Sequence, residues 1–187
     1  MIALHLAFSL IAAYVLVSQV EYWLHREPMH HMKFAKRMRS EFLRQLCFNH
    51  MALHHKKGYE HEPDEDGGYD SDHHEDDKRW QISLAGLIPN VIFCALLWLV
   101  DPISSVTLFV VGTVYGIVWW EVHNEMHRRQ GRAISRTAWF RYIEGRHRLH
   151  HKYPNTNYNL ILPLCDWLFG TEAPAQQLRP VRQVSSK

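Results

Sequence analysis

The sequence predicts an all-α integral-membrane protein, with about three transmembrane helices and a helical cap on one side that carries clustered histidines. Three observations predict this fold class. Apolar runs of about 20 residues, the length that a helix needs to cross a bilayer core, recur along the 187-residue chain. All 21 Lys and Arg residues lie outside these runs, in 26–79 and 128–187. Ten of the fifteen histidines fall into four short clusters.

The first predicted span covers residues 2–24. This stretch is largely apolar and closes with Tyr22 and Trp23, as a spanning helix with an interfacial aromatic belt does. A signal peptide is the alternative interpretation. The basic n-region of a signal peptide is missing, and no A-x-A cleavage site precedes the histidines that follow, so the span is favoured.

The second apolar block, residues 82–122, predicts a helical hairpin. Asp101 and Pro102 divide it into two halves, each about 20 residues long and sufficient to span a bilayer. We expect a tight turn at this pair. Pro89 lies inside the first half and predicts a kink there, because proline lacks the N–H of a regular helix.

The distribution of Lys and Arg predicts the orientation of the chain. Three spans place all of this charge on one side, which the positive-inside rule makes cytoplasmic, with the N-terminus and the Asp101 turn on the far side. The expected location is a bacterial inner membrane or the endoplasmic reticulum, with the histidine clusters on the cytoplasmic side. A soluble helical protein with buried core helices is the alternative.

One domain over residues 1–171 accounts for the length and composition. Within it, residues 33–55 predict a cytoplasmic helix and residues 56–81 an acidic loop insert. Residues 172–187 predict a flexible tail. The formal net charge of +2 does not favour a nucleic-acid partner. The three cysteines form no CxxC pair, which argues against a thiolate metal site and indicates a reducing compartment.

The histidine clusters have the spacing of metal ligands. Side chains three or four residues apart share one face of an α-helix, so a cluster can present two imidazoles together. Ten neutral imidazoles suffice for about five ligands on each of two ions, and imidazole suits Fe, Zn, Cu or Ni. The candidate metal ligands are His25, His30, His50, His54, His55, His123, His127, His147, His150 and His151.

The first cluster needs a break in its helix. His25 and His30 are five residues apart, about 140° around an ideal helix, and Pro28 between them supplies the break. The neighbouring His31 is an alternative to His30. His5 belongs to no cluster and is expected to be structural or incidental.

Other polar residues near the clusters are weaker candidates for metal binding or catalysis. His61, His73 and His74 lie in the acidic loop, where a solvated surface is favoured over a metal-delivery site. Glu121 and Glu125 are either carboxylates that fix a histidine tautomer or solvated helix residues. Asn124 occupies the place of the general base in the zincin motif, so metalloprotease chemistry is not supported.

The pattern H-x4-H, H-x3-HH, H-x3-H, H-x2-HH resembles the fatty acid hydroxylase/sterol desaturase superfamily. The closing segment NYNLILPLCDWLFGT (157–171) is similar to the segment that follows the last histidine box of that family, and the resemblance covers roughly residues 20–171. It implies two Fe ions on the ten histidines, for which Zn can substitute in purified protein, with O2 as co-substrate. No catalytic residue beyond the metal ligands is implied.

The implied reaction is the hydroxylation or desaturation of a lipid such as a fatty acyl chain or sterol. WFRYIEGRHRLHH (139–151) is similar to the carotenoid hydroxylase branch, so a carotenoid-type ring hydroxylase is an alternative. We expect a separate reductase or electron carrier, because the chain has no GxGxxG loop, haem-binding domain or iron–sulfur cysteine set. Aromatic residues of the spans are candidates for a lipid groove: Trp98, Phe109, Tyr115 and Trp119.

A metal transport or storage membrane protein is the alternative of another class. It predicts polar residues along the spans, but residues 91–100 and 106–120 carry no charge and no histidine. A purely structural or interaction protein leaves ten spaced histidines unexplained.

Overall fold

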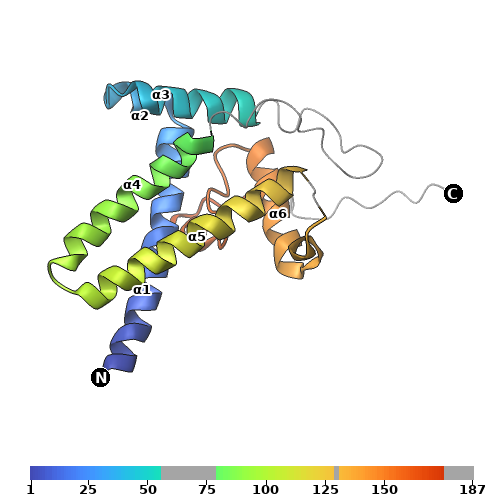
Figure 1. Cartoon of the computed structure of the whole chain (residues 1–187). Helices are drawn as coiled ribbons and strands as arrows, with labels where there is room; N and C mark the ends of the chain where they lie inside the picture. Colours follow the sequence, from blue (N-terminus) through green and yellow to red (C-terminus); the bar gives the residue numbers. More distant parts are fainter. Residues whose placement is uncertain (56–78, 129–130, 175–187) are drawn as a thin grey trace.

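A computed structural model describes residues 1–55, 79–128 and 131–174 (Figure 1). These ranges are helical and contain no strand, which confirms the predicted all-α class. The predicted acidic insert lies almost entirely outside the described residues, as do its histidines His61, His73 and His74. The predicted flexible tail lies outside them from residue 175 onward.

Three long helices form the body of the fold, and they lie side by side (Figure 1). They are α1 (Ile2–Leu24), α4 (Arg79–Trp98) and α5 (Pro102–Arg128). A small apolar core of Ala13, Val17 and Leu108 joins α1 to α5, and Cys94 and Leu97 of α4 pack against it. Helix α5 packs more extensively against α1 and against α4 than those two pack against each other, so it is the central helix of the three.

Two helical stretches are long and apolar enough to cross a membrane, Ile2–Met29 and Pro102–His127. Only 17% of the most apolar window of each is buried inside the structure, so large apolar side chains such as Phe8, Ile11 and Ile117 are exposed. Exposed apolar surface of this extent marks a contact with lipid or protein. The apolar stretch Ala85–Trp98 of α4 is shorter than these two, so the described residues contain two candidate spans where the sequence predicts three.

The predicted tight turn between α4 and α5 is present. Pro102 begins α5, and Asp101 before it accepts a hydrogen bond from the Ser104 N–H at 3.2 Å, as N-cap residues do. Hydrogen bonds from Ser104 lower the pKa of Asp101 to about 2. His5 Nε2 lies 2.7 Å from Asp101 Oδ2, so His5 links the start of α1 to this turn. Helix α4 runs through Pro89 without ending there.

The remaining elements gather at one end of the long helices (Figure 1). The segment predicted as one helix over 33–55 is divided, because Arg39 has a positive φ of 51° and ends the first helical piece. Ser40 then caps the next piece by accepting from the Leu43 N–H. The elements are η1 (His25–Met29), α2 (Met32–Arg37), α3 (Glu41–Phe48), η2 (Asn49–His55), η4 (Ala133–Arg136), α6 (Ala138–Lys152) and α7 (Leu164–Phe169).

Gly112 of α5 makes a close approach to α4 possible. A Cβ at this position would lie 2.6 Å from both terminal atoms of the Asn90 side chain, whereas a Cβ at Gly116 would meet nothing within 4 Å. We expect Gly112→Ala to lower the stability by about 1 kcal/mol, because Asn90 must leave its rotamer. Gly116→Ala should cause no loss.

The check is thermal or denaturant unfolding of the two variants in detergent. In a chain that already carries Asn90→Ala, the Gly112→Ala change should lower the stability much less, because the side chain that the new Cβ meets has been removed. Equal stability of the two glycine variants would contradict the packing described here.

Candidate metal centre

Two π-helical segments carry the histidines of the first two groups along the sequence, with His30 at the C-cap of the first segment. They are η1, which contains Pro28, and η2. A π-helix bonds residue i to i+5 rather than to i+4, so side chains five residues apart return to the same side. The His25 and His30 rings accordingly lie 5.0 Å apart between centroids, and those of His50 and His55 lie 4.8 Å apart. The helix therefore widens at Pro28 rather than breaking there.

The first group of converging imidazoles, here called cluster 1, draws on three parts of the chain. Its nitrogen donors all lie within 4.8 Å of one another. Its members are His25, His30, His50, His55 and His150.

The nitrogens of cluster 1 are arranged around a shared point. His50 Nε2 lies 3.1, 3.0 and 3.2 Å from the Nε2 atoms of His25, His30 and His55. One imidazole nitrogen cannot serve three hydrogen bonds to other imidazole nitrogens. Two imidazoles bound at about 2.1 Å to one ion, at right angles, have nitrogens about 3.0 Å apart. A shared cation therefore explains the spacing better than hydrogen bonding does.

The second group, cluster 2, comprises His54, His123, His127 and His147, all of them buried. The Nε2 atoms of His127 and His147 lie 2.9 Å apart, and those of His123 and His54 lie 3.3 Å apart. His151 joins this group at its edge, with its Nε2 3.1 Å from that of His147. All ten histidines predicted from the sequence are therefore brought together, in two groups.

The partition between the groups differs from the one that helical spacing predicts. His50 and His54 are four residues apart, yet His50 lies in cluster 1 and His54 in cluster 2, because η2 has π geometry. His147 and His150 are also divided between the two clusters, although both lie on the regular α-helix α6. The ring centroids of His50 and His54 are 5.0 Å apart, so the two clusters are direct neighbours. The predicted pairing of His123 with His127 on the regular helix α5 is confirmed.

The choice between His30 and His31 is made by their surroundings. His30 lies in cluster 1. The Nδ1 atom of His31 lies 3.3 Å from Glu27 Oε2, and His31 belongs to neither cluster. Of the two histidines, only His30 has a ring nitrogen that converges with those of other imidazoles, so His30 is the candidate ligand.

Backbone carbonyls fix the tautomers of two ligand candidates. The Nδ1–H groups of His25 and His150 donate to the carbonyls of Tyr158 and Thr156, each over 2.6 Å. A carbonyl can only accept, so each Nδ1 carries the proton and each Nε2 has a free lone pair. His150 Nε2 is buried and has no hydrogen-bond partner among the described residues. Such an atom costs about 1–3 kcal/mol unless something satisfies it, and a metal ion fits that need.

Asp166 of the closing segment holds the backbone around Tyr158, whose carbonyl accepts from His25. This buried carboxylate accepts from the N–H groups of Tyr158 and Asn159, both at 2.9 Å, and forms a buried ion pair with Arg146 at 3.1 Å. The sequence could not reveal this role of Asp166, because the N–H groups that Asp166 accepts from belong to the backbone and every residue except proline has one.

The contacts that Glu121 and Glu125 make among the described residues are with Arg132 rather than with a clustered histidine, and the burial of Glu125 contradicts the solvated interpretation of that residue. Both carboxylates contact Arg132: Glu121 as an ion pair, and Glu125 by accepting from the Arg132 N–H at 3.2 Å. The backbone carbonyls of Thr156 and Tyr158 act on His150 and His25 instead.

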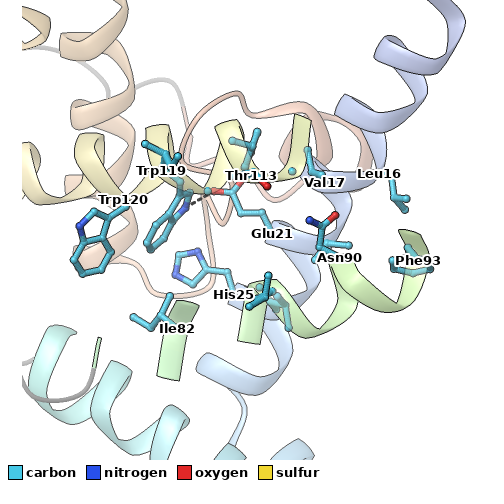
Figure 2. Close-up of a pocket in the computed structure, with 18 of the residues that line it drawn as sticks. Leu16, Val17, Glu21, His25, Ile82, Asn90, Phe93, Thr113, Trp119 and Trp120 are labelled. Atoms are coloured by element: carbon cyan, nitrogen blue, oxygen red, sulfur yellow. Dashed lines mark hydrogen bonds between the residues drawn. The ribbon is translucent and has the colours of Figure 1, made fainter. Parts of the chain in front are cut away.

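A cavity of about 570 Å³ lies between α1, α4 and α5 and reaches cluster 1 at His25 (Figure 2). Its wall is mainly apolar and includes Tyr115 and Trp119, two of the four predicted groove aromatics. The other two, Trp98 and Phe109, are more than half exposed on the outer surface. Glu21, which sequence reasoning did not single out, also lines the cavity; its signal was a lone acidic residue in an apolar run.

Burial favours the neutral form of five of the clustered histidines. It holds the pKa values of His50, His147, His150 and His151 well below the ordinary value, and lowers the pKa of His55 to about 3. Neutral imidazoles have the lone pairs that metal binding requires.

Comparison with protein-family models, curated proteins and solved structures found no match to this chain.

The lowered pKa values predict how the metal-free protein responds to acid. Below about pH 6.5 the unfolded chain binds protons that the folded clusters exclude, so stability is retained above this pH and falls as the pH drops. Each histidine contributes up to about 1.4 kcal/mol per pH unit.

The check is unfolding of chelator-treated protein between about pH 7.5 and pH 4.5. His150→Ala should give a shallower decline than the unaltered chain, because it removes one excluded proton. The same slope in both proteins would contradict the burial argument.

Proposed function

We propose that this chain is an integral-membrane oxygenase that holds two iron ions on its histidines and uses O2 to hydroxylate or desaturate a lipid. The observation that carries the proposal is the convergence of ten histidines into two adjacent groups, the first of which reaches an apolar cavity at His25. A lone buried histidine has many explanations, but two neighbouring groups of lone pairs fit a dinuclear site.

The residues present suit the two ions. Cluster 1 would hold one ion and cluster 2 with His151 the other, and zinc can take the same imidazole ligands. Iron bound there would supply O2-dependent oxidation of a C–H bond. The carbonyls of Tyr158 and Thr156 orient His25 and His150 for this task.

The cavity suits an apolar chain. Its lining from α1, α4 and α5 is mainly apolar and includes His25, so a bound chain would pass close to cluster 1. His25, His123 and His127 lie at the cap ends of the two candidate spans. A lipid whose head group stays at the interface would present its first few carbons there, so we expect oxidation near the polar end.

The proposal includes an orientation of the chain in the membrane. Helix α4 would serve as the third span, and the side rich in Lys and Arg would be cytoplasmic. Electrons would come from a separate reductase or carrier. A carotenoid-type ring hydroxylase is the alternative within the same chemistry. Metal transport or storage is less well supported, because both clusters lie at one end of the spans and no histidine follows along 91–100 or 106–120.

Lipid analysis tests the reaction. Cells that express the chain should contain a hydroxylated or desaturated lipid that is absent from cells expressing His150→Ala, because that variant removes the buried Nε2 of cluster 1. Tandem mass spectrometry should locate the new group within a few carbons of the polar end. A mid-chain position would contradict the proposed depth of the site, and identical lipids in both cell lines would contradict the reaction.

Metal content tests the ligand assignment. We expect about two iron atoms per chain after full loading, and fewer in His30→Ala. His31→Ala is the matched control: the neighbouring histidine contacts Glu27 and lies outside both clusters, so its removal should leave the metal content unchanged. An unaltered chain that never exceeds one metal, or equal loss in both variants, would refute the assignment.

A further inference from the structure

Glu21 of α1 has an unusual set of partners. Its Oε1 accepts from the Trp119 indole N–H at 2.7 Å and from the Leu160 N–H at 2.9 Å. Its Oε2 accepts from the Tyr115 hydroxyl at 2.6 Å and from the Asn159 amide at 2.8 Å. Figure 2 shows the carboxylate beside Trp119, with a dashed line for the hydrogen bond between them.

These donors are neutral, and together they occupy both carboxylate oxygens. A carboxylate inside a candidate span is costly and persists where hydrogen bonds or a functional role compensate it. Apolar packing alone does not require an acid here. The four donors come from α5 and from the closing segment, so one side chain joins three parts of the chain.

One branch of this network leads to cluster 1. Leu160 and Asn159 directly follow Tyr158, whose carbonyl accepts the His25 Nδ1–H. Asp166 holds the same loop from its other side, through the N–H groups of Tyr158 and Asn159. The carbonyl that sets the His25 tautomer therefore lies between two carboxylate anchors.

The other branch leads to cluster 2. The Trp119 ring stacks on His123 with centroids 4.8 Å apart and planes at 24°. Since Glu21 binds the indole N–H, it fixes the plane of the ring that supports His123. His123 Nε2 in turn lies 3.3 Å from that of His54.

We propose that Glu21 is a positioning residue shared by both metal sites, which holds the loop behind His25 and the indole behind His123. The inference rests on the proposed metal centre. It requires a carboxylate specifically, because four donors need two acceptor oxygens. A glutamine at this position offers one acceptor oxygen and turns an NH2 group toward two of the donors.

The test is Co²⁺ binding to the metal-free, full-length protein in detergent, by titration against a competing chelator. Glu21→Gln should weaken both binding steps by about 10–100-fold, the usual effect of losing a group that orients metal ligands. The visible absorption spectrum of bound Co²⁺ should also change. Glu41→Gln is the matched control, because that exposed carboxylate pairs with Arg44 on α3, and its binding and spectrum should equal those of the unaltered chain.

Two further variants test the two branches of the network one at a time. They also provide the test if Glu21→Gln does not fold. Trp119→Phe keeps an aromatic ring but removes the N–H donor, and should weaken one binding step. Asn159→Ala should weaken the other. If the unaltered chain binds two Co²⁺ and the Glu21, Trp119 and Asn159 variants match it in affinity and spectrum, the positioning role is wrong and the metal centre stands. If the unaltered chain binds none, both proposals fail.

Discussion

The structure depends on one constraint: imidazole lone pairs that face one another at about 3 Å must be compensated. Seven of the ten clustered histidines are buried, and His50 Nε2 alone has three imidazole nitrogens within 3.2 Å. Hydrogen bonds between the rings cannot satisfy such an arrangement, and protonation of several rings would place like charges together in a site of low polarity. A shared cation in each cluster resolves both problems.

The rest of the cap supports this arrangement. The π segments η1 and η2 bring side chains five residues apart to one side. Each segment therefore provides two histidines of cluster 1. The closing segment contributes the backbone carbonyl of Tyr158 rather than a side chain, and Asp166 and Glu21 both bind this segment. The candidate ligands are thus oriented by a second set of groups, several of which are backbone atoms.

The cavity connects this cap to the apolar helices. It lies between α1, α4 and α5, the helices with the most exposed apolar surface, and reaches the clusters at His25. This relation between an apolar cavity and a polar nitrogen-lined site is the physical basis for proposing lipid oxidation.

The sequence by itself determined the helical class, the turn at Asp101 and the ten histidines that converge, because helix length, hydropathy and spacing are local properties. It could not decide how the histidines divide between the clusters, since His50 and His54 separate only through the π geometry of η2. Tertiary structure also decided between His30 and His31, by placing Glu27 beside His31. The roles of Glu21, Tyr158 and Asp166 arise from contacts between segments distant along the chain, and no local pattern contains such information.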